Sequence, residues 1–184
     1  MKTRLAALLL TALVFAAPAC GGEESVTTLL ADLDAVVKLG RVEPVNGLTT
    51  AGQPNEAAFR VFAENGYRVV IDLRTEGENR GLDEPTVVES LGMKYILMPI
   101  GGEDITFEKA RELDELLNQF DEPVLLHCAS SNRVGALLAL NAFAETGDAD
   151  LAMEKGRAAG MKSLEMPVRG LIYAEKHRQT KKAP

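Results

Sequence analysis

The chain has 184 residues, of which 27 are acidic and 20 basic, and it carries a net charge of −7 with no tryptophan. An acidic surface and few aromatic side chains argue against nucleic-acid binding and against electrostatic attraction to anionic lipid. An anionic ligand must then be bound by a local positive site. No group of His, Cys and carboxylate residues has the spacing of a metal site, so we expect neither a metal nor another cofactor.

The first twenty residues have the pattern of an export signal. Met1 to Arg4 is basic, Leu5 to Ala17 is apolar, and small residues follow up to Cys20. This pattern predicts a secretory signal over residues 1–20 rather than a membrane span. The segment resembles a bacterial lipoprotein signal, which implies lipidation of Cys20, although Ala17 stands where leucine is usual. Ordinary cleavage nearby is the alternative. In both cases we expect export to the periplasm or the extracytoplasmic face. If Cys20 is lipidated, the lipid would be the only contact with the membrane.

The rest of the chain is long enough for one domain with a core of its own. We expect a tether and a short helix over residues 21–40 and a single catalytic domain over residues 41–180. Apolar periodicity, caps and breakers predict the elements in chain order. They are a helix over 29–39, a broken strand over 41–50, a helix over 55–64, a strand over 67–73, a helix over 85–91, a strand over 94–100, a helix capped by Thr106, a strand over 124–127, and helices over 134–146, 150–159 and 167–177.

Strands that alternate with helices in this way predict an α/β fold, with a mostly parallel central sheet flanked by helices on both faces. In such sheets, ligands bind beyond the carboxyl ends of the strands. Cys128 follows the strand over 124–127 and therefore lies at such an end.

The segment from Pro123 to Gly135 is the most informative part of the chain. It predicts a buried strand, a short polar loop that begins at Cys128 and ends at Arg133, and an apolar helix. A helix N-terminus presents unpaired N–H groups and a partial positive charge, which favour an anion or a thiolate. Arginine adds a planar fork of donors that matches phosphate or sulfate oxygens. The segment thus predicts a thiolate nucleophile in an oxyanion pocket.

A cysteine at the end of an apolar strand can also be a simple packing residue. Two features favour a functional thiol at Cys128. The loop residues Ala129 to Asn132 are small and leave room for a ligand. If Cys20 carries lipid, Cys128 has no disulfide partner, which is unusual for an exported protein.

The order of four sequence blocks resembles the cysteine-dependent phosphatases, the superfamily of protein tyrosine and dual-specificity phosphatases. The resemblance runs from about Gly47 to Ala144, and it is strongest to the phosphatase-like domain of bacterial beta-lactamase hydrolase-like proteins. The blocks that carry it are Leu48 to Pro54, Val70 to Arg74 with Glu78 beyond, Tyr95 to Ile100, and His127 to Arg133.

This resemblance implies roles for individual residues. Cys128 would attack phosphorus to give a cysteinyl-phosphate, and Arg133 would hold the non-bridging oxygens. Asp104, with Glu103 as second choice, would protonate the leaving group, although an acid at this place can also simply stabilise a helix start. The expected partner is a phosphorylated small molecule or phosphoprotein, bound by a monomer. The backbone N–H groups expected to bind the substrate belong to Ala129, Ser130, Ser131, Asn132 and Val134.

Two departures from the phosphatase pattern leave the reaction open. Four residues separate Cys128 from Arg133, whereas the phosphatase loop has five and rhodanese-like sulfurtransferases have four. Val134 stands where phosphatases usually have a hydroxyl residue. The alternatives are a sulfurtransferase that carries a persulfide on Cys128, and an inactive module that binds an anion or a phosphoprotein.

Three further polar residues are expected to have structural roles. His127 faces away from Cys128 along the strand, and we expect it to be buried and to bond the loop backbone. For Asp72 and Arg74, which end another strand, we expect a contact with each other.

Overall fold

The computed structural model describes residues 29–182, with side chains up to residue 181. At its centre lies a four-stranded sheet in the order β1 (Leu48–Ala51), β4 (Val124–His127), β2 (Val69–Asp72), β3 (Lys94–Leu97), and every neighbouring pair is parallel. The parallel sheet confirms the fold predicted from the sequence. His127 is in register with Ala51 on one side and Asp72 on the other, so three strands end side by side at one edge.

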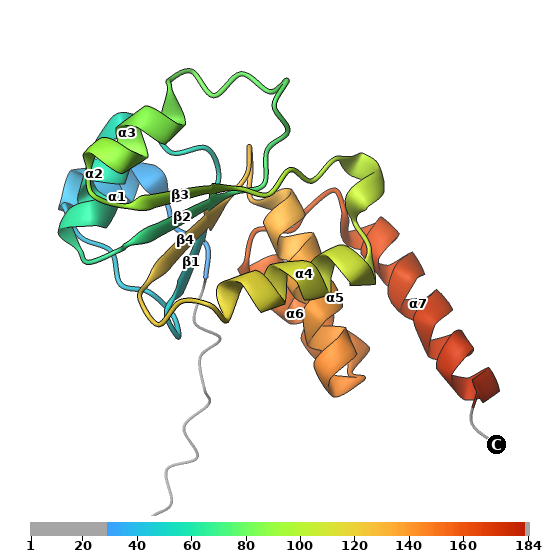
Figure 1. Cartoon of the computed structure of the whole chain (residues 1–184). Coiled ribbons are helices and arrows are strands. Elements are labelled where there is room, and N and C mark those ends of the chain that lie inside the picture. Colours follow the sequence, from blue (N-terminus) through green and yellow to red (C-terminus); the bar gives the residue numbers. More distant parts are fainter. Residues whose placement is uncertain (1–28, 183–184) are drawn as a thin grey trace, which may run out of the picture.

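Helices cover both faces of this sheet (Figure 1). One face packs against α1 (Leu33–Leu39), α2 (Glu56–Glu64) and α3 (Glu84–Ser90). The other packs against α4 (Phe107–Leu117), α5 (Asn132–Thr146), α6 (Ala149–Ala158) and α7 (Glu165–Lys182). Alternation along β4 produces this division, because Leu125 packs in the first core and Leu126 in the second. Among the described residues, no helix is long and apolar enough to span a membrane.

Most predicted elements are present, and the differences have local causes. The broken strand over 41–50 is wrong in its first part, because the chain turns at Gly47, whose φ is 80°, and β1 begins only at Leu48. The helix predicted from Val134 begins earlier, at Asn132. The last helix continues to Lys182 instead of ending at residue 177. The predicted signal and Cys20 lie outside the described residues.

The helix starts differ in one respect that matters for the site. Side-chain oxygens cap α1, α2, α3, α4 and α6, each accepting a backbone N–H of the first turn. Such caps satisfy donors that have no partner inside the helix. The N-cap of α5 is Ser131, in a left-handed conformation with φ of 61°, and its side chain makes no cap bond. The first N–H groups of α5 are therefore not neutralised by a side-chain cap.

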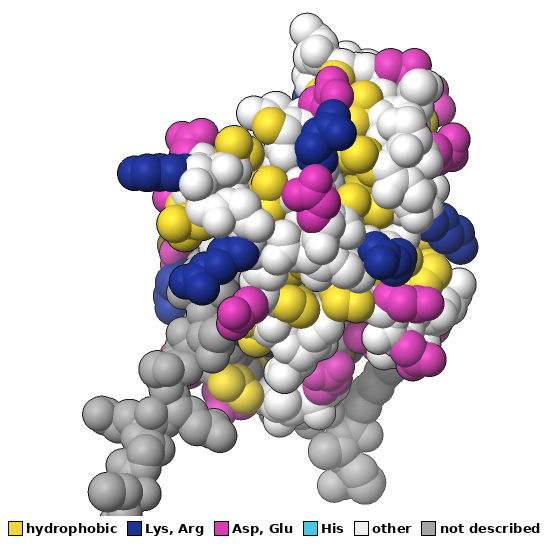
Figure 2. Space-filling model, turned by 90° about the vertical axis from the view of Figure 1, so that its left-hand side faces the viewer, with side chains coloured by type: hydrophobic (Ala, Val, Ile, Leu, Met, Phe, Trp, Pro, Cys, Tyr) yellow, Lys and Arg dark blue, Asp and Glu magenta, His cyan; other side chains and the backbone are white. Residues whose placement is uncertain are grey.

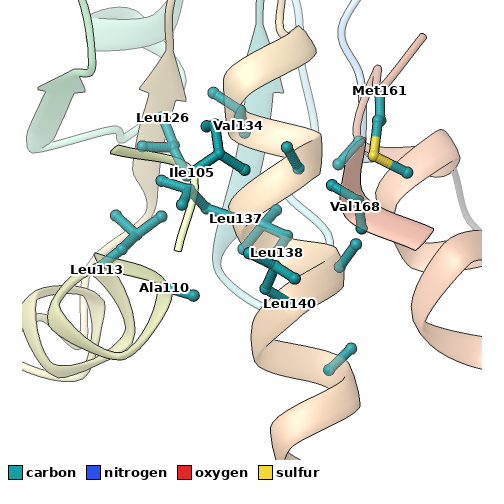
Figure 3. Packing of buried hydrophobic residues seen from close by; sticks show 14 of the residues in the cluster. Ile105, Ala110, Leu113, Leu126, Val134, Leu137, Leu138, Leu140, Met161 and Val168 are labelled. Atoms are coloured by element: carbon teal, nitrogen blue, oxygen red, sulfur yellow. The ribbon is translucent and has the colours of Figure 1, made fainter. Parts of the chain in front are cut away.

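Helix α5 forms the centre of the second core, between α4 and the segment that leads into α7 (Figure 3). It is held closely against α6, because a Cβ on Gly135 would lie 2.4 Å from the carbonyl oxygen of Gly156. Nothing larger than glycine fits there without a shift of backbone. This contact fixes the first turn of α5, the turn that follows the cysteine loop.

Figure 2 shows one outer face of the molecule, on which Lys and Arg side chains are interspersed with Asp, Glu and apolar ones. No continuous basic area is visible on this face. This face therefore offers no continuous basic surface for the anion binding expected from the sequence.

Candidate active site

Cys128 lies directly after the central strand β4, at the edge where the strands end. Its backbone N–H donates to the carbonyl of Ala51, and its side chain is only 1% exposed. The next two residues, Ala129 and Ser130, are exposed. The thiol is thus buried at the base of a loop whose outer part faces solvent.

The middle of the cysteine loop is hydrogen-bonded to neighbouring segments on both of its sides. Ser130 pairs with Gly52, and the carbonyl of Ala129 accepts the backbone N–H of Gln53 at 3.2 Å. On the other side, the Ser131 hydroxyl donates to the carbonyl of Ala159 at 2.7 Å. These contacts hold the loop in one conformation, and they assign Ser131 a structural role.

Asn132 has a similar structural role. Its Oδ1 accepts the backbone N–H of Lys162 at 2.8 Å, and its Nδ2 donates to the hydroxyl of Ser163 at 2.7 Å. Val134 is fully buried in the core. The polar groups that this stretch can offer to an anion are therefore chiefly backbone N–H groups at the start of α5, which a helix dipole makes favourable for negative charge.

Arg133 is held in place by a carboxylate that lies 55 residues earlier in the chain. Its two terminal nitrogens donate to Glu78 at 2.6 and 2.7 Å, and Nη1 also donates to the carbonyl of Ile100 at 2.9 Å. The hydrogen bonds from Arg133 hold the pKa of Glu78 well below its usual range. Conversely, the hydrogen bonds to Glu78 raise the pKa of Arg133, and the neighbouring Cys128 side chain adds to this effect.

The predicted contact between Asp72 and Arg74 is made by the backbone of Arg74 and not by its guanidinium group. The backbone N–H of Arg74 donates to Asp72 Oδ1 at 2.7 Å, but the guanidinium extends elsewhere. It donates to Glu78 Oε2 at 3.2 Å, to the carbonyl of Asn79 at 2.7 Å and to Gln53 Oε1. The expected contact between Asp72 and Arg74 is therefore present through the Arg74 backbone, while the Arg74 side chain supports the carboxylate that orients Arg133.

Asp72 pairs instead with Arg80, which the sequence analysis did not single out. Arg80 Nε lies 2.6 Å from Asp72 Oδ2, and the Tyr95 hydroxyl donates to the same oxygen at 2.9 Å. Burial lowers the pKa of Arg80, but the hydrogen bond and the charge of Asp72 outweigh this and raise it. Burial and the Asp72 charge both raise the pKa of Tyr95. Asp72 is therefore a fully compensated buried carboxylate.

His127 is buried, as predicted, but it does not bond the loop backbone. Its Nε2 lies 2.7 Å from Oε1 of Glu84, and both side chains are 0% exposed. The other ring nitrogen, Nδ1, is buried and has no partner among the described residues. The expectation failed because Glu84 begins α3, 43 residues away, and no local pattern marks it as a partner of His127.

Asp72, Glu84 and His127 form a group whose potential ligand atoms lie within 4.8 Å of one another, which the sequence analysis did not foresee. A cation here would have to displace the Arg80 N–H from Asp72 and the His127 contact from Glu84. Each carboxylate already has a donor, so the arrangement serves as a hydrogen-bond network without any ion.

The two candidate acids lie in a short 3₁₀ turn, η1 (Gly102–Asp104), next to the Ile100 carbonyl that accepts from Arg133. Asp104 Oδ2 accepts the backbone N–H of Gly101 at 2.7 Å, so this carboxylate helps to close its own turn. Glu103 is exposed. The catalytic role of either acid stays a prediction.

Comparison with known proteins places this site in a family. The sequence model of the family described as "PTP-NADK: DSP-PTPase phosphatase fused to NAD+ Kinase" matches residues 27–168. The match covers most of the chain, including every residue of the site described above. The chain belongs to this family, and it is a cysteine-dependent phosphatase-like domain.

Curated relatives agree with the resemblance seen in the sequence. The chain is 35% identical over 98 residues to the beta-lactamase hydrolase-like protein of Xylella fastidiosa, covering 51% of this chain and 23% of that protein. It is 31% identical over 97 residues to the beta-lactamase hydrolase-like protein of Agrobacterium fabrum, and this match covers 50% of this chain and 22% of that protein. The chain thus corresponds to less than a quarter of the length of either relative.

Solved structures share the fold at low sequence identity. A predicted phosphatase from Neisseria meningitidis superposes with a TM-score of 0.58 at 20% identity, covering 66% of this chain and 91% of that one. A second predicted phosphatase, from Shewanella putrefaciens, gives a TM-score of 0.53 at 19% identity, covering 80% and 98%. Kinase associated phosphatase, with its catalytic-site cysteine substituted by serine, superposes with a TM-score of 0.52 at 15% identity. This match covers 69% of this chain and 78% of that one.

Proposed function

We propose that the protein is an exported hydrolase of phosphate monoesters that works through a cysteinyl-phosphate on Cys128. The thiolate attacks phosphorus while the ester oxygen leaves with a proton, and water then cleaves the sulfur–phosphorus bond to release phosphate. The observation that carries this proposal is the position of Cys128 at the uncapped start of α5, beside an arginine already oriented by Glu78.

In this proposal the non-bridging phosphoryl oxygens are held by the first N–H groups of α5 and by Arg133. The Glu78 pair keeps the guanidinium plane in one orientation before substrate arrives, which reduces the entropy lost on binding. The pair also balances the charge of Arg133, so that an incoming dianion is held chiefly by geometry and by oriented dipoles.

We propose Asp104 as the acid that protonates the leaving oxygen, with Glu103 as the alternative. Support comes from the turn that carries both residues, since it follows Ile100, whose carbonyl contacts Arg133. The bond from Gly101 to Asp104 Oδ2 is compatible with this role, because the second carboxylate oxygen can carry the proton.

Sulfur transfer is the second candidate, and the four-residue spacing between Cys128 and Arg133 is the observation that favours it. In that reaction Cys128 would accept a sulfane sulfur as a persulfide and pass it to a nucleophile, with no need for a general acid. Membership of a phosphatase family makes ester hydrolysis the first candidate.

One experiment separates these candidates. Purified protein is assayed with an aryl phosphate and, in parallel, with thiosulfate plus cyanide, and Cys128→Ser is the control in both. We expect phosphate release by the wild type, no turnover by Cys128→Ser, and no thiocyanate. Thiocyanate without phosphate release would overturn the proposal in favour of sulfur transfer, and no turnover of either substrate would favour an anion-binding module.

The proposed site of action is outside the cytoplasm, with the chain held at the membrane by lipid on Cys20. This rests on the sequence pattern of residues 1–20, which lie outside the described part of the structure.

A further inference from the structure

A groove lies at the edge of the sheet opposite to the cysteine loop, and the reaction proposed above does not use it. It is lined by Leu48 and Val124, the first residues of β1 and β4, whereas Cys128 follows the last residue of β4. The groove has a volume of about 520 Å³, within the range of roughly 300 to 1,000 Å³ that is usual for binding sites. It is therefore large enough to take part of a partner molecule.

The groove combines an apolar base with an acidic rim. Its apolar lining includes Leu48, Leu117, Phe120, Val124, Leu138 and Leu151, of which Leu151 is 47% exposed. Five carboxylates and one ammonium group also line it, an excess of four negative charges, and they belong to Asp114, Asp121, Glu122, Glu145, Glu154 and Lys155. Charges of one sign along low-dielectric walls attract the opposite sign. The groove thus fits a partner that is both apolar and basic.

Hydrogen bonds within the groove do not neutralise this negative charge. Asn141 Nδ2 donates to Asp114 Oδ1 and to Glu145 Oε1, each at 3.0 Å. Asn118 Nδ2 donates to Asp114 Oδ2 at 3.1 Å. Both donors are uncharged amides, so the carboxylates that they hold in place keep their charge for a partner.

The C-terminal end of α7 has the complementary character. The last turns of α7 extend beyond the other helices (Figure 1), and from Tyr173 to Lys181 only Glu175 is half-buried, while the rest is exposed. The rings of Tyr173 and His177 lie 4.2 Å apart. Lys176 follows Tyr173 by three residues and Lys181 follows His177 by four, so both lysines border these rings. A helix end without tertiary packing is marginally stable in water, and a partner that covers it would stabilise it.

We propose that the groove binds the C-terminal end of α7 from a second copy of this chain, and that two copies exchange these ends in a reciprocal dimer. Each copy has one groove and one α7 end, so a two-fold exchange uses both and closes, whereas a one-way contact would continue into a filament. The cysteine loops lie at the opposite edge of each sheet and stay accessible. The inference therefore does not depend on the proposed function.

The charges favour a second copy over other parts of the same chain. Leu29 lines the groove, but residues 21–28 contain Glu23 and Glu24 and no Lys or Arg, so the acidic rim would repel them. Among the described residues, none from α7 lines the groove of its own copy. Val168 and Ile172 are buried in the second core, which keeps α7 from turning toward that groove.

Sedimentation of the purified protein tests the exchange, at concentrations from about 5 to about 500 µM. Two short helix ends form an interface at the lower end of specific interfaces, so we expect a dissociation constant of roughly 1 to 100 µM. Raising the salt from about 0.05 M to about 1 M shortens the Debye length to ~3 Å and should weaken the dimer at least about tenfold. A protein that stays monomeric over the whole range at low salt, as expected from the sequence, would overturn the proposal.

Exchanged charges identify the two surfaces. Lys176→Glu with Lys181→Glu makes the helix end acidic. Asp121→Lys, Glu122→Lys and Glu154→Lys, all at exposed positions, change the excess in the groove to two positive charges. Each variant alone should lose self-association, because like charges meet. An equimolar mixture of the two should form a heterodimer in which both contacts again join opposite charges. Failure of this mixture to associate, or unchanged self-association of either variant, would contradict the proposed contact.

The matched control is Lys38→Glu with Arg60→Glu, which makes the same change of charge as the helix-end variant. Both positions are exposed, and they lie on α1 and α2, which cover the other face of the sheet. The control should associate like the wild type. Loss of association in the control would show that net charge governs it, and the assignment of the groove would be wrong.

A fluorescent probe tests where the helix end lies in the dimer. The chain contains no tryptophan, so Tyr173→Trp introduces a single indole. Its emission should shift to shorter wavelength as dimer forms, because the apolar groove excludes water, and the shift should disappear when the groove charges are reversed in the same chain. An indole that stays exposed to water at concentrations where sedimentation finds a dimer would place the contact elsewhere and refute the proposal. Sedimentation of the unsubstituted protein is decisive even if a variant fails to fold.

Discussion

The pairing of Glu78 with Arg133 provides the sharpest test of how this site is held together. The Glu78 carboxylate accepts from Arg133 on both oxygens, from the backbone and hydroxyl of Thr75 on Oε1, and from Arg74 on Oε2. The substitution Glu78→Gln keeps the shape but puts an N–H₂ group at one of the two oxygen positions. If the carbonyl takes the place of Oε1, the amide nitrogen faces donors on both Arg133 and Arg74.

The expected loss follows from these contacts. Hydrogen bonds to charged groups contribute roughly 1.5 to 3 kcal/mol each, and partial exposure of Glu78 screens part of this. Two such contacts are lost, so we expect the free energy of unfolding to fall by about 2 to 3 kcal/mol. For a domain of this size, that corresponds to a decrease in Tm of roughly 4 to 12 °C. Turnover of an aryl phosphate should fall as well, because Arg133 is no longer held in one orientation.

The pH dependence gives a second, independent readout. The folded-state pKa of Glu78 is lowered, chiefly by hydrogen bonds from Arg133, so its stabilising effect is present at neutral pH and is lost as the pH falls. The difference in unfolding free energy between wild type and Glu78→Gln should shrink by about 1.4 kcal/mol for each pH unit below ~4.3. Glu76→Gln, at an exposed acid of the same loop, is the control and should show neither effect. Chemical denaturation at several pH values measures both effects, and an unchanged free energy of unfolding for Glu78→Gln would refute this reasoning.

Four other substitutions test the remaining roles. Arg133→Lys keeps the charge but loses the planar fork, so vanadate should inhibit more weakly and turnover should slow; a variant that matches wild type would exclude Arg133 as the oxyanion clamp. Asp104→Asn should slow hydrolysis of alkyl phosphates by ~10² to 10⁴, with a much smaller effect on esters with good leaving groups, whereas Glu103→Gln should be mild. Exchanged behaviour of these two variants would identify Glu103 as the acid. Metabolic labelling with a fatty-acid analogue should mark the wild type and not Cys20→Ala, and an unlabelled wild type would indicate an exported protein without lipid.

Short-range patterns in the sequence were sufficient to predict most of the helices and strands of this protein and the place of the cysteine loop among them. The apolar run over 124–127, the small polar loop and the apolar helix that follows place Cys128 and Arg133 correctly at the end of a central parallel strand. The helix starts at Asn55 and Thr106 could also be predicted from the sequence, because a capping side chain accepts N–H groups only two or three residues away. Signals of this kind depend on neighbours in the chain, so a single sequence contains them.

Only the tertiary structure decided which side chains surround the nucleophile. Glu78 reaches Arg133 across 55 residues, and Glu84 reaches His127 across 43. In the sequence, Glu78 and Glu84 lie among several other acidic residues in a polar stretch. That stretch predicts a loop and a helix start but no partner for either carboxylate. Their partners become visible when the parallel strands bring their carboxyl ends to one edge of the sheet, where an unpaired buried charge would be costly and each carboxylate must find a donor.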